Sequence, residues 1–246
     1  MTGIAGRAYP GSHRRGRRAR LGPLLVPLAA TCLLGLGALA FIAYVLWPRW
    51  PGAPVAPGTP AIPITIAGVA FNVPPAAIRV TMQRRPGAHE RVDLVFLWPS
   101  LAPPDPAARP AAAVPVSPPV PMPTIERVFV TITGAGATLS PADRVKIIYP
   151  RYTVTDPAPG PDGLAVLAFR DGTPYQGEDL IYDAAGGGFL VRCTRSGAGP
   201  TPGTCLYDRR IEGADLVVRF ARDWLGDWRV VASNIERLIA KLRPPG

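Results

Sequence analysis

Apolar residues form an unbroken run near the start of the sequence, with no charged residue between positions 21 and 47. At a rise of 1.5 Å per residue, residues 28–47 make a helix of about 30 Å, which matches the hydrocarbon thickness of a bilayer. Pro23 and Pro27 fall in the first turns, where proline does least damage to a helix. The pattern predicts a single transmembrane helix over residues 21–47.

Beyond residue 63 the chain changes to short runs that are rich in β-branched and aromatic residues and end at proline, glycine or aspartate turns. Between residues 125 and 133, Val128, Val130 and Ile132 share one face while Phe129 and Thr131 lie on the other. Such alternation and spacing predict a mainly antiparallel, sandwich-like β domain over residues 64–246. The predicted strands are residues 64–71, 92–98, 125–133, 144–149, 164–169, 188–195, 204–211 and 214–221.

The last part of the chain has the period of a helix. One apolar stripe with steps of three and four residues consists of Trp224, Trp228, Val231, Ile235, Leu238 and Leu242. We expect an amphipathic helix over about residues 224–242 that packs on the sheet, which accounts for the stripe without a cofactor. The expected fold class is therefore a membrane-anchored α+β protein: one N-terminal transmembrane helix and a mainly antiparallel β domain closed by this helix.

Proline adds two segments to this picture, since the chain of 246 residues contains 32 prolines. Residues 48–63 carry prolines at close, near-regular intervals, which favours an extended polyproline II spacer between the membrane and the domain. Residues 99–123 are also proline-rich. They interrupt two predicted strands, so we expect a surface excursion within one domain.

The net charge of +10 is concentrated at the N-terminus, because residues 1–20 hold six arginines and no acid. We expect this tail to be disordered and to contact anionic lipid headgroups. Positive charge beside a span stays in the cytoplasm, so the prediction is a plasma (inner) membrane protein with a cytoplasmic N-terminus and an extracytoplasmic, periplasmic domain. The arginines that set this topology are Arg14, Arg15, Arg17, Arg18 and Arg20. With Tyr9 as its one aromatic residue and no folded reader, the tail is not expected to bind nucleic acid.

The outer end of the span is predicted to lie at Tyr44, Trp47 and Trp50, because such amphipathic rings favour the membrane interface. A competing interpretation is a cleaved signal peptide, since Ala38-Leu39-Ala40 has the small-residue spacing of a cleavage site. The apolar run continues to Trp47, beyond that site. We therefore expect an uncleaved anchor.

Two of the three cysteines are placed to pair. Cys193 and Cys205 flank a glycine- and proline-rich loop between two predicted strands, so a hairpin brings them together. Exported proteins meet an oxidising compartment, which predicts a structural disulfide. Neither a zinc site nor a redox motif fits, because other ligands are scarce and the C-x-x-C spacing is absent.

Candidate catalytic chemistry is sparse. The sequence lacks the nucleophile-elbow, H-E-x-x-H and phosphate-loop motifs, and His89 lies in a polar turn. Paired carboxylates, with Glu178 and a second acid such as Asp183, leave open an envelope hydrolase acting on glycan or peptidoglycan. The favoured hypothesis is a non-catalytic binding or assembly module for an unidentified envelope protein or polymer, with no catalytic, cofactor or metal site expected.

Overall fold

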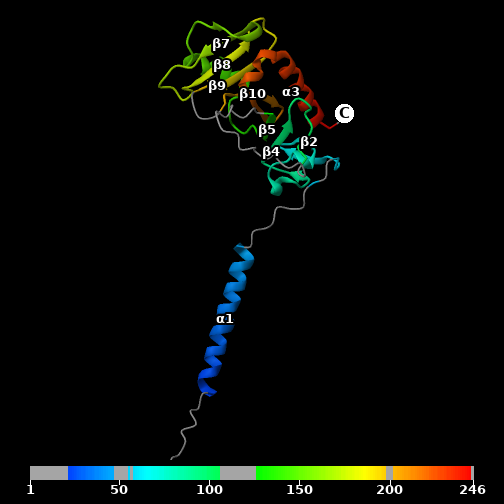
Figure 1. Cartoon of the computed structure of the whole chain (residues 1–246), viewed down its shortest axis with the longest axis vertical. Coiled ribbons are helices and arrows are strands. Elements are labelled where there is room, and N and C mark those ends of the chain that lie inside the picture. Colours follow the sequence, from blue (N-terminus) through cyan, green and yellow to red (C-terminus); the bar gives the residue numbers. More distant parts are fainter. Residues whose placement is uncertain (1–21, 47–54, 56–57, 106–125, 198–201, 245–246) are drawn as a thin grey trace, which may run out of the picture. The chain divides into compact units, whose positions relative to one another are not determined.

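The computed structural model describes residues 22–46, 55, 58–105, 126–197 and 202–244, and the chain divides into two units after Pro51. The first unit contains α1 (Gly22–Leu46), drawn in blue in Figure 1. Its stretch Val26–Tyr44 has a mean hydropathy of 2.2 and no buried residue, so it is long and apolar enough to cross a membrane. An N-terminal helix of this kind serves as a signal sequence or as an anchor.

The described residues of the second unit form two sheets. In the larger one all neighbouring strands are antiparallel. Its order is β4 (Arg91–Leu97), β5 (Arg127–Gly134), β11 (Ala214–Ala221), β10 (Thr204–Ile211), β9 (Leu190–Thr194), β8 (Glu178–Asp183), β7 (Leu164–Ala168) and β6 (Ala158–Pro159). The smaller sheet has the order β2 (Val69–Val73), β1 (Ile62–Ile66) and β3 (Gly87–Ala88), in which β1 and β3 are parallel.

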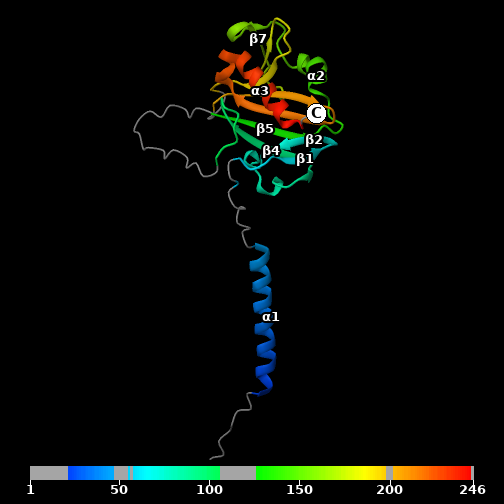
Figure 2. The same cartoon turned by 90° about the vertical axis from the view of Figure 1, so that its right-hand side faces the viewer.

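Both sheets share one hydrophobic core with the C-terminal helix α3 (Trp228–Leu242). Figures 1 and 2 show α3 against one face of the larger sheet. The expected α+β class is confirmed, with a C-terminal helix packed on a mainly antiparallel sheet. Short helical turns connect these elements: Pro75–Ala77, Thr81–Gln83, α2 (Pro141–Asp143), Arg144–Ile148, Tyr149–Arg151, Pro161–Gly163 and Arg222–Asp227.

The apolar stripe of α3 is buried as predicted, apart from its first residue. Five of its members are at most 7% exposed: Trp228, Val231, Ile235, Leu238 and Leu242. Trp224 is only partly buried and stacks on Trp98 with ring centroids 4.4 Å apart. It lies in the tight turn Arg222–Asp227, so the helix begins at Trp228 and not at 224 as predicted. Gly226 within that turn weakens helix initiation there.

Two strand predictions are wrong. Residues 64–71 form a hairpin, because the chain reverses at Ala67 and Gly68, whose φ angles of 48° and 83° suit a two-residue turn. Residues 144–149 are helical. Their β-branched residues suggested a strand, whereas Ser140 begins a helical turn just before them by accepting a hydrogen bond from the amide of Asp143.

The predicted disulfide between Cys193 and Cys205 joins β9 to β10. The two residues are direct partners in the strand register, with Cα atoms 4.0 Å apart, and both are fully buried. Cys32 is the free cysteine among the described residues.

Removing this disulfide is expected to lower the free energy of unfolding by about 3 kcal/mol, because the unfolded chain gains the entropy of an open loop. The change is Cys193→Ala with Cys205→Ala, measured by urea unfolding under oxidising conditions. Cys32→Ser is the control and should leave the value unchanged. If the double variant and the parent unfold at the same urea concentration under these oxidising conditions, the bridge contributes nothing to stability.

A second prediction concerns the phenol of Tyr207, which donates a 2.7 Å hydrogen bond to Glu236 of α3. Burial, followed by the contact with Glu236, raises the pKa of Tyr207 to about 12. Because the folded value lies above the unfolded one, this contact stabilises the fold fully below pH 10, and the stabilisation is lost as the pH rises through about 12.

Absorbance at 295 nm should therefore show a phenol that titrates near pH 12 and disappears in Tyr207→Phe. Tyr182→Phe, the control, should retain that component. An amplitude loss in Tyr207→Phe that falls near pH 10, with the component near pH 12 retained, would contradict the assignment.

Candidate functional site

A pocket of about 590 Å³ lies between the helical segment 140–149 and strands β9 and β10. This volume lies within the usual range for small-molecule sites. The pocket is lined by Ser140, Pro141, Ala142, Val145, Lys146, Tyr149, Gly188, Leu190, Arg192, Leu206, Tyr207, Asp208, Arg209 and Arg210. It lies on the sheet face opposite α3, as the alternation of β10 shows.

Alternation along β10 determines which side chains face the pocket. Successive residues of a strand point to opposite faces. Tyr207 and Arg209 contact Glu236 of α3, at 2.7 and 3.6 Å. Asp208 and Arg210 therefore lie on the other face, beneath segment 140–149.

Segment 140–149 is fixed at both of its ends. At its start, Ser140 accepts a 3.1 Å hydrogen bond from the amide of Asp143 and donates a 2.6 Å bond to the carboxylate of that residue. At its end, Tyr149 packs edge-on against Phe169 and Tyr175, with ring centroids 5.6 and 5.5 Å apart. These rings belong to a second, smaller core, so the segment stands over the sheet and leaves the pocket beneath it.

Three ion pairs hold the charged groups at the pocket in place. Arg144 pairs with Asp208 at 3.2 Å, and Arg192 pairs with Glu178. Two hydrogen bonds of 2.6 and 2.8 Å join Arg210 to Asp215, a bidentate geometry that fixes the guanidinium plane.

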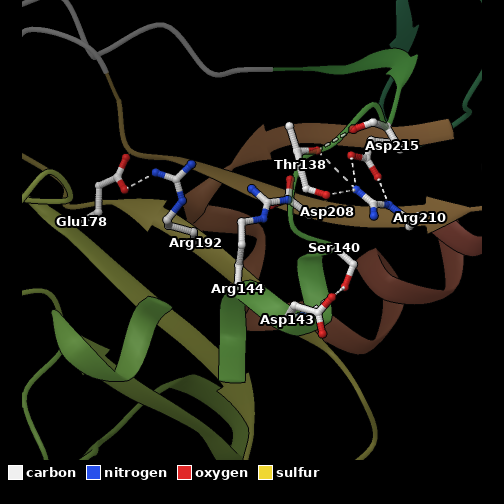
Figure 3. Close-up of polar contacts among 10 residues, drawn as sticks. Thr138, Ser140, Asp143, Arg144, Glu178, Arg192, Asp208, Arg210 and Asp215 are labelled. Carbon is white, nitrogen blue, oxygen red and sulfur yellow. Dashed lines mark hydrogen bonds and ion pairs between the residues drawn. The ribbon is translucent and has the colours of Figure 1, made fainter. Parts of the chain in front are cut away.

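Figure 3 shows these side chains in a row that begins at Glu178 and Arg192 and continues through Arg144 and Asp208 to Arg210. Arg192 also stacks over the ring of Tyr175, with its guanidinium carbon 5.2 Å from the ring centroid. The cationic groups are therefore held by neighbours on several elements, which limits their movement.

Burial has the largest effect on the pKa values of three side chains that line the pocket. It raises the pKa of Asp208, although the charges of Arg144 and Arg192 oppose the change. Burial also raises the pKa of Tyr149, again against those two arginines. Arg192 is disfavoured as a cation by burial, but its hydrogen bond to Glu178 and the charge of that residue outweigh this and raise its pKa.

Polar atoms without partners lie beside these ion pairs. Within the described part of the chain, the Nε atoms of Arg144 and Arg192 are enclosed and make no hydrogen bond. The hydroxyl of Tyr149, a pocket residue, also makes no hydrogen bond to the described residues, but unlike those two nitrogen atoms it is not enclosed. Lys146 is exposed at the rim and pairs with no acid of the described ranges.

The carboxylates considered for hydrolysis do not form a pair. Glu178 and Asp183 are the two ends of β8, about 17 Å apart at 3.4 Å per residue and on opposite faces because their separation is odd. Glu178 is bound to Arg192, while Asp183 accepts hydrogen bonds from the amides of Ala185 and Gly187. A glycosidase needs its two carboxyls within about 10 Å of each other.

The remaining residues singled out from the sequence lie elsewhere in the chain. Tyr44 is 80% exposed on α1. Trp47 and Trp50 lie outside the described residues, as do Arg14, Arg15, Arg17, Arg18 and Arg20. The Nε2 of His89 donates a 2.9 Å hydrogen bond to the backbone carbonyl of Arg85. Among the described residues, no group of three or more His, Cys, Asp or Glu side chains could hold a metal ion.

Sequence reasoning missed the pocket because its charged residues come from distant parts of the chain. Arg144 and Lys146 were included in a predicted strand, and Arg192 and Asp208 fell in strands without a role. One local signal was present: Ser140-Pro141-Ala142-Asp143 has a capping serine, a proline at the first helical position and an acid two residues later. That motif indicates a helix start.

A buried ion cluster lies on the face of the sheet opposite the pocket. Asp179 of β8 is 5% exposed and lies directly opposite Cys193 in the register. Its two carboxylate oxygens accept bonds of 2.8 Å from Arg195 and 2.7 Å from Arg222. The cluster and the disulfide therefore connect the ends of β8, β9, β10 and β11.

Asp179→Asn is expected to lower the free energy of unfolding by about 3 kcal/mol, because it leaves two partly buried arginines without a carboxylate. Urea unfolding measures the change. Asp156→Asn, at an exposed position, is the control and should cost almost nothing. Equal stabilities for the two variants would show that the cluster has no structural role.

The chain shows only limited similarity to known proteins. No protein-family profile matches the sequence, and no curated protein matches it. Among solved structures, the chain is similar to an immunity protein of the Stenotrophomonas maltophilia type IV secretion system, with a TM-score of 0.48 and 16% identity over 76% of this chain and 94% of that one. It is also similar to the iron-regulated outer membrane lipoprotein FrpD of Neisseria meningitidis, with a TM-score of 0.43 and 8% identity over 77% and 96% of the two chains.

Proposed function

We propose that this chain is a single-pass protein of the plasma membrane whose extracytoplasmic domain is a non-catalytic binding module. Residues 1–20 lie in the cytoplasm, residues 21–47 span the bilayer, residues 48–63 act as a spacer, and residues 64–246 form the binding domain. The observation that carries the role in binding is the pocket beneath segment 140–149.

The pocket is suited to holding a ligand. Its charged groups are fixed by ion pairs to neighbouring strands, and its remaining wall is apolar, from Val145, Leu190 and Leu206. Ligand sites commonly combine an apolar wall with a few convergent polar groups. The alternative, an envelope hydrolase using Glu178 and a second acid, has no support from the positions of Glu178 and Asp183.

The membrane topology is supported by two features of the chain. Val26–Tyr44 has the composition of a span, and the arginines before it favour retention of that end in the cytoplasm. A disulfide in the domain suits an oxidising compartment on the other side of the membrane. The apolar run past Ala40 favours an anchor over a cleaved signal peptide.

The topology is tested by fusing alkaline phosphatase, which is active only after export, to the C-terminus of the full chain in a bacterial host. We expect an active fusion that stays in the membrane after carbonate extraction and has the mass of the uncleaved chain. A matched fusion of β-galactosidase, which is active only in the cytosol, should be inactive.

The opposite activities would overturn the proposed topology. Loss of the 40 residues up to Ala40 from the mature protein would overturn the anchor and leave an exported domain. The non-catalytic role is tested with purified peptidoglycan as substrate: the parent and Glu178→Gln should both release nothing. Release by the parent that Glu178→Gln abolishes would establish the hydrolase.

A further inference from the structure

We propose that the pocket beneath segment 140–149 binds a small organic anion, a molecule with a carboxylate or phosphate group attached to an apolar body. This inference rests on the proposed role of the domain as a binding module and names the class of its ligand. The observations are the sign of the charges on the wall, the unpartnered donors and the apolar part of the lining.

Cations predominate among the charged side chains that line the pocket. Lys146, Arg192 and Arg210 belong to the wall, whereas Glu178 and Asp215, which pair with the two arginines, do not. The arginine pairs are therefore arranged with their positive members on the pocket side. An arginine that is paired through some of its nitrogens keeps further N–H donors, and these can bind a carboxylate or phosphate oxygen.

The acid among the lining residues is Asp208, and its charge is countered. Arg144 lies 3.2 Å from its carboxylate, and Arg192 acts on it as well. Burial also raises the pKa of Asp208, so its environment disfavours negative charge. A ligand anion entering the pocket thus meets Lys146, Arg192 and Arg210 with little opposing charge from the wall.

Two donors at the pocket lack partners within the described residues. Lys146 is exposed at the rim and pairs with no acid there. The hydroxyl of Tyr149, another lining residue, makes no hydrogen bond to the described residues and is not enclosed, so it can donate to a ligand. An anionic oxygen in the pocket would supply an acceptor for both.

Much of the remaining lining is apolar, which suits a ligand with an apolar body. Pro141, Ala142 and Val145 come from the helical segment, and Leu190 and Leu206 come from the strands below it. A free inorganic anion would leave this surface uncovered. The volume of about 590 Å³ accommodates a ligand much larger than phosphate alone.

The test uses 2-naphthoate as the probe and 2-naphthylmethanol as its uncharged counterpart, with the full chain in phosphatidylcholine nanodiscs. Isothermal titration calorimetry, corrected with empty discs, should show naphthoate binding at least tenfold more tightly. Equal affinities, or no binding of naphthoate, would overturn the proposal.

Two matched pairs of variants locate the binding. The chain has two lysines, Lys146 and Lys241, so Lys146→Gln should weaken naphthoate binding about tenfold while Lys241→Gln changes it less than twofold. Ala142→Trp should block the pocket, whereas Ala88→Trp, at another exposed position, should not. If either pair behaves alike, the anion does not bind at this pocket.

Acetylation of the lysines gives a second readout that does not depend on affinity. Saturating naphthoate should slow acetylation of the Lys146 amine at least threefold, with Lys241 of the same molecule as the internal control. If the natural ligand is a free organic acid, Lys146 should be protected only when naphthoate is added. If the natural ligand is a lipid headgroup, phosphatidylglycerol discs should protect Lys146 even without naphthoate. Lack of protection in every condition would overturn the proposal.

Failure of this inference is distinguishable from failure of the proposed function. An active alkaline phosphatase fusion with no naphthoate binding would overturn the ligand class and leave the topology intact. A cytosolic domain that binds naphthoate through Lys146 would overturn the proposed location and leave the ligand class standing.

Discussion

The packing of α3 on one face of the large sheet is the interaction on which the rest of the structure depends. Its buried residues Val231, Ile235 and Leu238 join the strands and the small sheet in a single core. Because strand side chains alternate, this packing directs Tyr207 towards α3 and Asp208 to the far face. Because Asp208 points away from the core, a charged side chain is tolerated at this position. The pocket lies on the face that α3 does not cover.

The stabilising cross-links and the charged side chains of the pocket lie on opposite faces of the large sheet. The disulfide and the Asp179 cluster hold the ends of four strands on the α3 side. The charged residues on the opposite side, including Arg192 and Arg210, are paired to neighbouring strands and not to the core. Arg210 pairs with Asp215 of β11, and Arg192 pairs with Glu178 of β8 and stacks over Tyr175, so these contacts lie apart from the main core beneath α3.

Much of the fold was predictable from the sequence, since the N-terminal apolar helix, the C-terminal stripe and the paired cysteines are strong local patterns. The hairpin at Ala67-Gly68 was missed because its two strands continue one apolar run. The β-branched residues of segment 144–149 predict a strand, but the capping serine at Ser140 begins a helical turn just before them. The pocket was not predictable, because Arg144, Arg192 and Asp208 meet only through the order of the strands. Local periodicity does not determine that order.

The account depends most on the domain lying in an oxidising compartment outside the cytoplasm. The direct measurement is the thiol count of the chain in intact cells, trapped with acid and alkylated under denaturing conditions. We expect one alkylated residue, Cys32, with Cys193 and Cys205 protected until a reductant is added. Three alkylated cysteines without reductant would place the domain in the cytosol and contradict the account.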